Sequence, residues 1–239
     1  MPTEIEWADE TWNPVTGCSS YSIGCAHCYA KRIAERFKRD RNPKYRNGFK
    51  VTTHPDALGD PLKMKRSKLI FVCSMGDLFH NEVPASFIEQ VMSTMRKAHW
   101  HTFVLLTKRA DRLASWPTPF PRNVWPGVSV ESQAHTKRLE KLRKVDARVR
   151  VVSFEPLVGE IWEFDTKGIG WVIVGGEQGV GARKMEDEWV NFIVNTCHIV
   201  KVPIFFKQWG SAHGMRDARV DGFVVKEVPH RHNEQAHLF

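Results

Sequence analysis

The chain has 239 residues, of which 42% are hydrophobic and 26% are charged, a composition that excludes disordered and collagen-like proteins. The 35 Lys and Arg against 27 Asp and Glu give a net charge of +8, which favours an anionic partner without fixing its kind. No apolar run reaches the roughly 20 residues that span a bilayer, and the first residues lack the pattern of a signal peptide. We therefore expect a cytoplasmic protein that makes no membrane contact.

Short apolar runs, rich in β-branched and aromatic residues, predict buried strands along the chain. They cover residues 69–73, 102–106, 128–130, 149–153, 171–174 and 202–206. Helical periodicity lies between them, for example at Phe87, Val91 and Met95. This alternation of strands and helices is what right-handed parallel crossovers require, so we expect an α/β fold with a wound parallel sheet or barrel. No linker interrupts the pattern, and we expect residues 1–239 to form a single domain with residues 211–239 as a C-terminal extension.

Three of the five cysteines lie close together with the spacing C-x6-C-x2-C, at Cys18, Cys25 and Cys28. Clustered thiolates at this density favour a metal site, and they suit either zinc or an iron–sulfur cluster. A structural zinc site needs a fourth ligand, for which His27 and Cys73 are the candidates. A cubane cluster held by three thiolates instead leaves one iron open for a substrate or cofactor.

Polar or glycine residues follow each predicted strand, at the edge where parallel α/β proteins collect their chemistry. Lysine there can pair with a carboxylate or phosphate, while glutamate can hydrogen-bond ribose hydroxyls or an ammonium group. The candidate catalytic residues are Lys108, Glu155, Glu177 and Lys207, and Glu131 is a candidate cofactor contact. A buried ring of Lys and Glu is costly unless it is paired, so a structural layer of salt bridges at the barrel mouth is the alternative.

Segments along the whole chain resemble one family of proteins. They are residues 12–29, which contain the three cysteines, and residues 74–79, 153–157, 174–177 and 206–210. The cysteine loop resembles that of the radical S-adenosylmethionine superfamily. Its longer first interval, C-x6-C in place of the more common C-x3-C, is similar to that of a phage-associated family of radical SAM-like proteins with a three-cysteine motif. The other segments resemble this same family, whose function is largely unassigned.

The resemblance implies a partial TIM-like barrel in which Cys18, Cys25 and Cys28 hold a 4Fe-4S cluster that binds S-adenosylmethionine. Cleavage of this cofactor would give a 5′-deoxyadenosyl radical that abstracts hydrogen from a substrate in a closed site. The resemblance also places a group of cofactor-binding residues after the second strand, namely Ser74, Met75, Gly76 and Asp77. An electron donor such as a flavodoxin or ferredoxin is the implied partner.

A basic stretch follows the cysteine loop and extends from Arg36 to Lys68. It is interpreted either as a solvated helical face with its loop or as a phosphate-binding patch. Together with nine tryptophans, the charge favours nucleic acid, DNA or RNA, as the substrate class. The leading hypothesis is a radical SAM-like iron–sulfur enzyme that acts on a nucleic acid or nucleotide-derived substrate. The alternative is a zinc-stabilised barrel that binds nucleic acid or a partner protein without radical chemistry.

Overall fold

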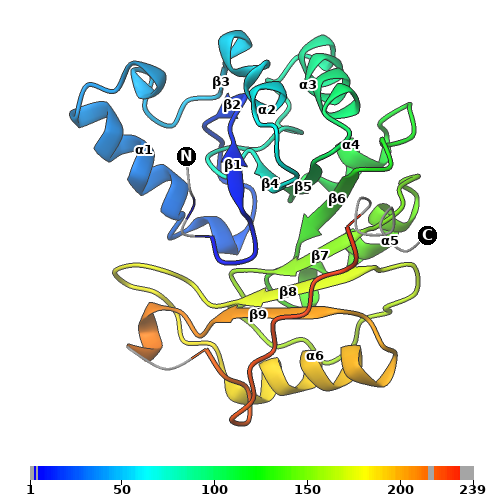
Figure 1. Cartoon of the computed structure of the whole chain (residues 1–239). Coiled ribbons are helices and arrows are strands. Elements are labelled where there is room, and N and C mark those ends of the chain that lie inside the picture. Colours follow the sequence, from blue (N-terminus) through cyan, green and yellow to red (C-terminus); the bar gives the residue numbers. More distant parts are fainter. Residues whose placement is uncertain (1–2, 4, 215–217, 232–239) are drawn as a thin grey trace.

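The computed structural model describes residue 3, residues 5–214 and residues 218–231, and its main element is one curled sheet of seven parallel strands. The strands are β1 (Glu10–Trp12), β4 (Leu69–Val72), β5 (Thr102–Thr107), β6 (Val124–Ser129), β7 (Val151–Phe154), β8 (Trp171–Gly175) and β9 (Ile204–Gln208). They are adjacent in chain order, with β1 and β9 at the two edges of a half-barrel (Figure 1). The predicted partial TIM-like barrel with parallel strands is therefore confirmed.

The helices and a small hairpin complete the fold. The helices are α1 (Tyr29–Arg39), α2 (Asp60–Lys63), α3 (Ala85–Lys97), α4 (Ala110–Ala114), α5 (Lys137–Arg143) and α6 (Asp187–Ile199), and the hairpin pairs β2 (Val15–Thr16) with β3 (Thr52–Thr53). As predicted, α3 buries Phe87, Val91 and Met95 against the sheet. Within the described residues, none of the helices has the length and apolar character that crossing a membrane requires.

The strands β4, β5, β7, β8 and β9 differ from their predicted bounds by one or two residues, and β6 differs most. The apolar run at 128–130 gave only the end of β6, which begins at Val124 and pairs with Phe103 of β5. Pro126 and Gly127 lie inside the strand and hide it from pattern reading, because both residue types are rare in strands. Gly127 is needed there, since an added Cβ would collide with the carbonyl oxygen of Val151 on the neighbouring strand.

Large aromatic side chains belong to one of the buried clusters that pack on the sheet. This cluster contains Trp7, Trp125, Trp171 and Phe205, and the rings of Trp7 and Trp171 meet edge to face with centroids 5.6 Å apart. The C-terminal segment lies along edge strand β9, where the Phe206 amide donates to the carbonyl of Val225 at 2.8 Å. It thereby covers the backbone groups that an open edge would expose.

Candidate functional site

The three clustered cysteines line one cavity of about 850 Å³. The cysteine loop, residues 18–28, forms one wall, and one face of α1 together with residues 47–51 forms the other. All three thiols are free and partly exposed. The loop begins beside the residues that follow β4. Gly17, which directly precedes the loop, forms a parallel bridge with Gly76, and the amide of Gly17 donates to the Met75 carbonyl at 2.8 Å.

Arg109, at the end of β5, holds the Cys18 end of the loop. Its Nη1 lies 3.4 Å from the Cys18 Sγ and 2.8 Å from Oδ2 of Asp77, and its Nη2 donates to the Ser19 hydroxyl at 3.1 Å. Asp77 also accepts from the Thr107 hydroxyl at 2.9 Å, which fixes the carboxylate that orients Arg109. Burial raises the pKa of Cys18 to about 11, with Asp77 acting in the same direction and Arg109 against it.

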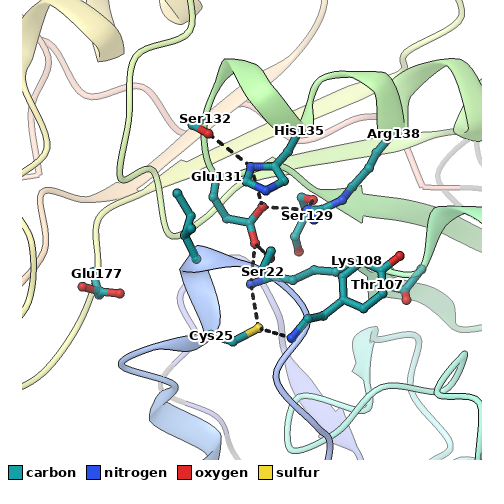
Figure 2. Close-up of polar contacts among 12 residues, drawn as sticks. Ser22, Cys25, Thr107, Lys108, Ser129, Glu131, Ser132, His135, Arg138 and Glu177 are labelled. Atoms are coloured by element: carbon teal, nitrogen blue, oxygen red, sulfur yellow. Dashed lines mark hydrogen bonds and ion pairs between the residues drawn. The ribbon is translucent and has the colours of Figure 1, made fainter.

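Lys108 approaches the second thiol, and its Nζ lies 3.7 Å from the Cys25 Sγ (Figure 2). The same sulfur accepts from the backbone amide of Tyr21 at 3.4 Å. Burial acts to raise the pKa of Cys25, but Lys108 and the backbone amides of Ser22 and Tyr21 outweigh it, so the net shift is downward. Cys25 therefore deprotonates more readily than Cys18, and the thiolate is the form that binds a soft metal.

Glu131, at the end of β6, is the centre of the polar network in Figure 2. Its fully buried carboxylate lies 2.8 Å from Lys108 and 2.6 Å from Arg138, and it accepts a short hydrogen bond from Ser22 in the cysteine loop. Burial acts to raise the pKa of Glu131, but these partners, Lys108 first, lower it. Gly24 lets the loop pack here, since an added Cβ would lie 2.5 Å from the Glu131 Cγ.

The other predicted strand-end residues are also paired. Lys207 of β9 lies 2.6 Å from Oε1 of Glu155, which follows β7. Glu177, after β8, accepts from the guanidinium of Arg183, with 3.0 Å between Nε and Oε2. Such ion pairs are what the alternative, a structural layer of salt bridges, requires, and the catalytic role of Glu155, Glu177 and Lys207 stays a prediction.

Two of these pairs also connect to the start of α1 and to the cysteine loop. Burial, and then the carboxylate of Glu155, raise the pKa of Tyr29, the first residue of α1. Arg183 donates to the Ile23 carbonyl in the loop at 3.0 Å, so it joins Glu177 to the loop. Glu177 itself lies apart from the Glu131 network (Figure 2).

The residues predicted to bind the cofactor after the second strand lie against the cysteine loop and α1. The Ser74 carbonyl accepts from the Tyr29 hydroxyl at 2.6 Å, and the Met75 amide donates to Oδ1 of Asn13 at 2.9 Å. Gly76 pairs with Gly17 through the bridge described above. None of residues 74–77 is among the residues that line the cavity, and their role as S-adenosylmethionine contacts stays a prediction.

The two candidates for a fourth zinc ligand do not line the cavity. Cys73 is a core residue, 3% exposed, and burial raises its pKa to about 12. His27 is exposed, and its ring faces Gly181 on the loop after β8. Across the described part of the chain, no three His, Cys, Asp or Glu side chains are grouped closely enough to hold a metal ion. The three thiols therefore share a cavity but must turn toward one another to share a metal.

The number and type of donors nonetheless fit an iron–sulfur cluster. Three free thiols border one cavity, and the cations of Lys108 and Arg109 stand beside two of the sulfurs, where they can offset thiolate charge.

The sequence analysis assigned no role to three arginines and a tyrosine that complete this site. Arg109, Arg138 and Arg183 neutralise Asp77, Glu131 and Glu177. The ring of Tyr21, in the cysteine loop, has the guanidinium of Arg109 5.0 Å and that of Arg138 5.6 Å from its centroid. The sequence could have indicated Arg109, which follows a predicted strand closely. The contacts of Arg138, Arg183 and Tyr21 depend on how the cysteine loop folds across the barrel mouth.

Comparisons with known proteins give one family and one recurrent fold. The family model described as "Protein of unknown function (DUF5131)" matches residues 2–235. A comparison with curated proteins gave no match. Among solved structures, a spore photoproduct lyase double mutant with bound AdoMet and dinucleoside spore photoproduct is similar, with a TM-score of 0.53 and 10% identity over 82% of this chain. A single mutant of the same enzyme has a TM-score of 0.49 and 12% identity, covering 74% of this chain and 58% of that one.

At these identities the likeness shows the fold alone. This chain spans about 62% of the length of the lyase chain with bound AdoMet.

Proposed function

The chain belongs to the family described as "Protein of unknown function (DUF5131)". We propose that it is a radical S-adenosylmethionine-type iron–sulfur enzyme. We propose a nucleic acid or nucleotide-derived compound as its substrate. The observation that carries the proposal is the convergence of Cys18, Cys25 and Cys28 on one cavity, with cations against two of the sulfurs. The bound AdoMet and dinucleoside photoproduct of the similarly folded lyase support this choice of cofactor and substrate class.

Cys18, Cys25 and Cys28 would hold a 4Fe-4S cluster, and this cluster would supply the one electron that splits S-adenosylmethionine into methionine and a 5′-deoxyadenosyl radical. This chain's own residues prepare the site for it. Against the effect of burial, Lys108 lowers the pKa of Cys25, and Arg109 partly opposes the rise that burial causes in the pKa of Cys18. Each cation is held in place by a buried carboxylate, Glu131 or Asp77. The cationic side chains therefore keep their position when the thiols ionise.

The remaining residues are divided between cofactor and substrate. We assign Ser74, Met75, Gly76 and Asp77, together with Glu131, to S-adenosylmethionine. We assign Lys108, Glu155, Glu177 and Lys207 to the substrate side of the barrel mouth, where their ion pairs are positioned to exchange a partner for a polar substrate group. A flavodoxin or ferredoxin is the proposed electron donor.

A zinc-stabilised binding protein is the second candidate, and one observation favours it. Glu35 and Glu82 also line the cavity, and a carboxylate oxygen can complete a tetrahedral zinc site with three thiolates. Such a protein would bind nucleic acid or a partner protein without radical chemistry, and its metal content separates it from the first candidate.

Cofactor cleavage tests the proposed enzyme. Anaerobically reconstituted and reduced protein should convert S-adenosylmethionine to 5′-deoxyadenosine, measured by liquid chromatography. Cys25→Ala should abolish the product, whereas Cys197→Ala, which changes a buried cysteine of α6 outside the cavity, should retain it. If the reconstituted wild type forms no product with any nucleic-acid substrate, or if Cys25→Ala matches the wild type, the proposal is wrong.

A further inference from the structure

Nearly all of the net charge of the chain lies in one short segment. Residues 29–50, which we call the basic segment, contain nine Lys and Arg and two acidic residues, a net charge of +7. The rest of the chain contains 26 Lys and Arg and 25 acidic residues, a net charge of +1. The nine cations are Lys31, Arg32, Arg36, Lys38, Arg39, Arg41, Lys44, Arg46 and Lys50. The +8 of the chain is therefore a local feature of its surface.

Most of these cations face solvent, and the guanidinium of Arg36 lies 5.4 Å from the centroid of the Phe37 ring. Eight of the nine are exposed, and Lys44 is half-buried. Among the described residues, none of the nine forms an ion pair within 4.0 Å, unlike the cations at the barrel mouth. Their mutual repulsion is unfavourable for the folded chain alone, and it is relieved when a polyanion binds.

The basic segment is continuous with the cysteine cavity. The face of α1 that carries Lys31 and Lys38 forms part of the cavity lining, and Lys50, which follows the helix in the chain, lines the same cavity. The apolar side of α1 packs through Ala30 and Ala34. In Figure 1 the helix lies at the edge of the molecule, apart from α3 and α6. Its 11 residues span about 16 Å, the length of roughly five nucleotides of one strand.

We propose that the basic segment binds the phosphodiester backbone of a nucleic-acid strand and leads the strand to the cysteine cavity. Unpaired cations spread over a helix and the following loop match a linear polyanion, because each can contact a different phosphate. Tyr29, whose ring is 38% exposed, is the one large apolar side chain of the segment that is exposed, so the segment lacks the apolar face that inserts into a membrane. Delivery of the nucleic-acid strand to the cysteine cavity rests on the proposed function, whereas binding of the strand to the basic segment does not.

Binding of a fluorescent single-stranded 20-nucleotide DNA, followed by anisotropy at several KCl concentrations, tests the proposal. The variant Arg36→Gln/Arg39→Gln/Arg46→Gln removes three exposed charges from the basic segment. The matched control Lys65→Gln/Arg66→Gln/Lys97→Gln removes three exposed charges elsewhere. We expect the first variant to lower the slope of log K against log salt by about 2 and to weaken binding at least about tenfold at 0.1 M salt, while the control stays near the wild type. Equal losses in both variants would overturn the proposal.

Lysine acetylation, vesicle competition and iron content provide three further tests of where the DNA binds and of whether this binding depends on the proposed enzyme. In the wild type, bound DNA should protect Lys38 and Lys50 from acetylation more than Lys65, and uniform protection would contradict the surface. Vesicles of phosphatidylserine and phosphatidylcholine should not displace the DNA, and tighter binding to vesicles than to DNA would also overturn it. Iron content is measured on the same preparations. If the wild type holds no iron but the variants still differ in DNA binding, the proposed enzyme fails while the binding surface stands.

Discussion

Replacing Lys108 by Met should slow the alkylation of Cys25 in the metal-free protein. Lys108 is the strongest influence that lowers the pKa of Cys25, and burial, which raises it, is unchanged by the substitution. Removing the cation therefore raises the pKa of Cys25. Each unit of increase lowers the thiolate fraction about tenfold but raises the nucleophilicity of that thiolate, so the alkylation rate falls about threefold to fourfold per unit.

The wild type provides the reference for this effect. Burial raises the pKa of Cys18 to about 11, whereas for Cys25 burial is outweighed by Lys108 and the backbone amides of Ser22 and Tyr21, which lower its pKa. At pH 8 a larger fraction of Cys25 is therefore thiolate, and Cys25 should be alkylated faster than Cys18. Limiting iodoacetamide followed by peptide mass spectrometry measures both sites in one sample.

The matched control is Lys207→Met, which removes a cation paired with Glu155 that, among the described residues, makes no hydrogen bond to a thiol. Its Cys25 should react at the wild-type rate. If Cys18 reacts faster than Cys25 in the wild type, or if Lys108→Met and Lys207→Met behave alike, the electrostatic account of the loop is wrong.

Three more perturbations follow from buried contacts. Glu131→Gln leaves Arg138 without its carboxylate and should lower the free energy of unfolding by about 3 kcal/mol in urea titrations, and an unchanged midpoint would contradict the network. Gly24→Ala pushes the cysteine loop off Glu131 and should speed proteolysis within the loop, whereas equal cleavage rates would show that the loop is not docked there. Burial lowers the pKa of His101, whose Nδ1 accepts from the Lys68 amide, so the unfolded state takes up a proton first as pH falls below about 6.5. Between pH 7.5 and 5.5, His101 should therefore lower the free energy of unfolding by up to about 1.4 kcal/mol per pH unit as the pH falls. His101→Gln should reduce this pH dependence, and an equal pH dependence in both proteins would refute the assignment to His101.

The sequence predicted the sheet where a strand is continuously apolar. Residues 69–73 and 171–174 have that pattern because both faces of a parallel sheet are buried. The prediction from the sequence missed most of β6, because Pro126 and Gly127 interrupt the apolar pattern although the strand pairs with a neighbour on both sides. Local residue preference cannot show that Gly127 makes room for a neighbouring carbonyl.

The site was predictable to the extent that its signal is local. The spacing of Cys18, Cys25 and Cys28 is visible in the sequence, and the structure places all three in one cavity. The interaction of Arg138 with both Glu131 and Tyr21 is not visible, because it depends on the cysteine loop folding across the barrel mouth. The basic stretch predicted over residues 36–68 carries a net charge of +8, and the structure places Lys38 and Lys50 of this stretch in the lining of the cysteine cavity, which the sequence could not show.

The metal content of anaerobically purified protein tests the central claim most directly. The account predicts iron and sulfide near four per chain with broad absorbance near roughly 400 nm, lost in Cys25→Ala and retained in Cys197→Ala. Stoichiometric zinc without iron, even after anaerobic reconstitution, would contradict it.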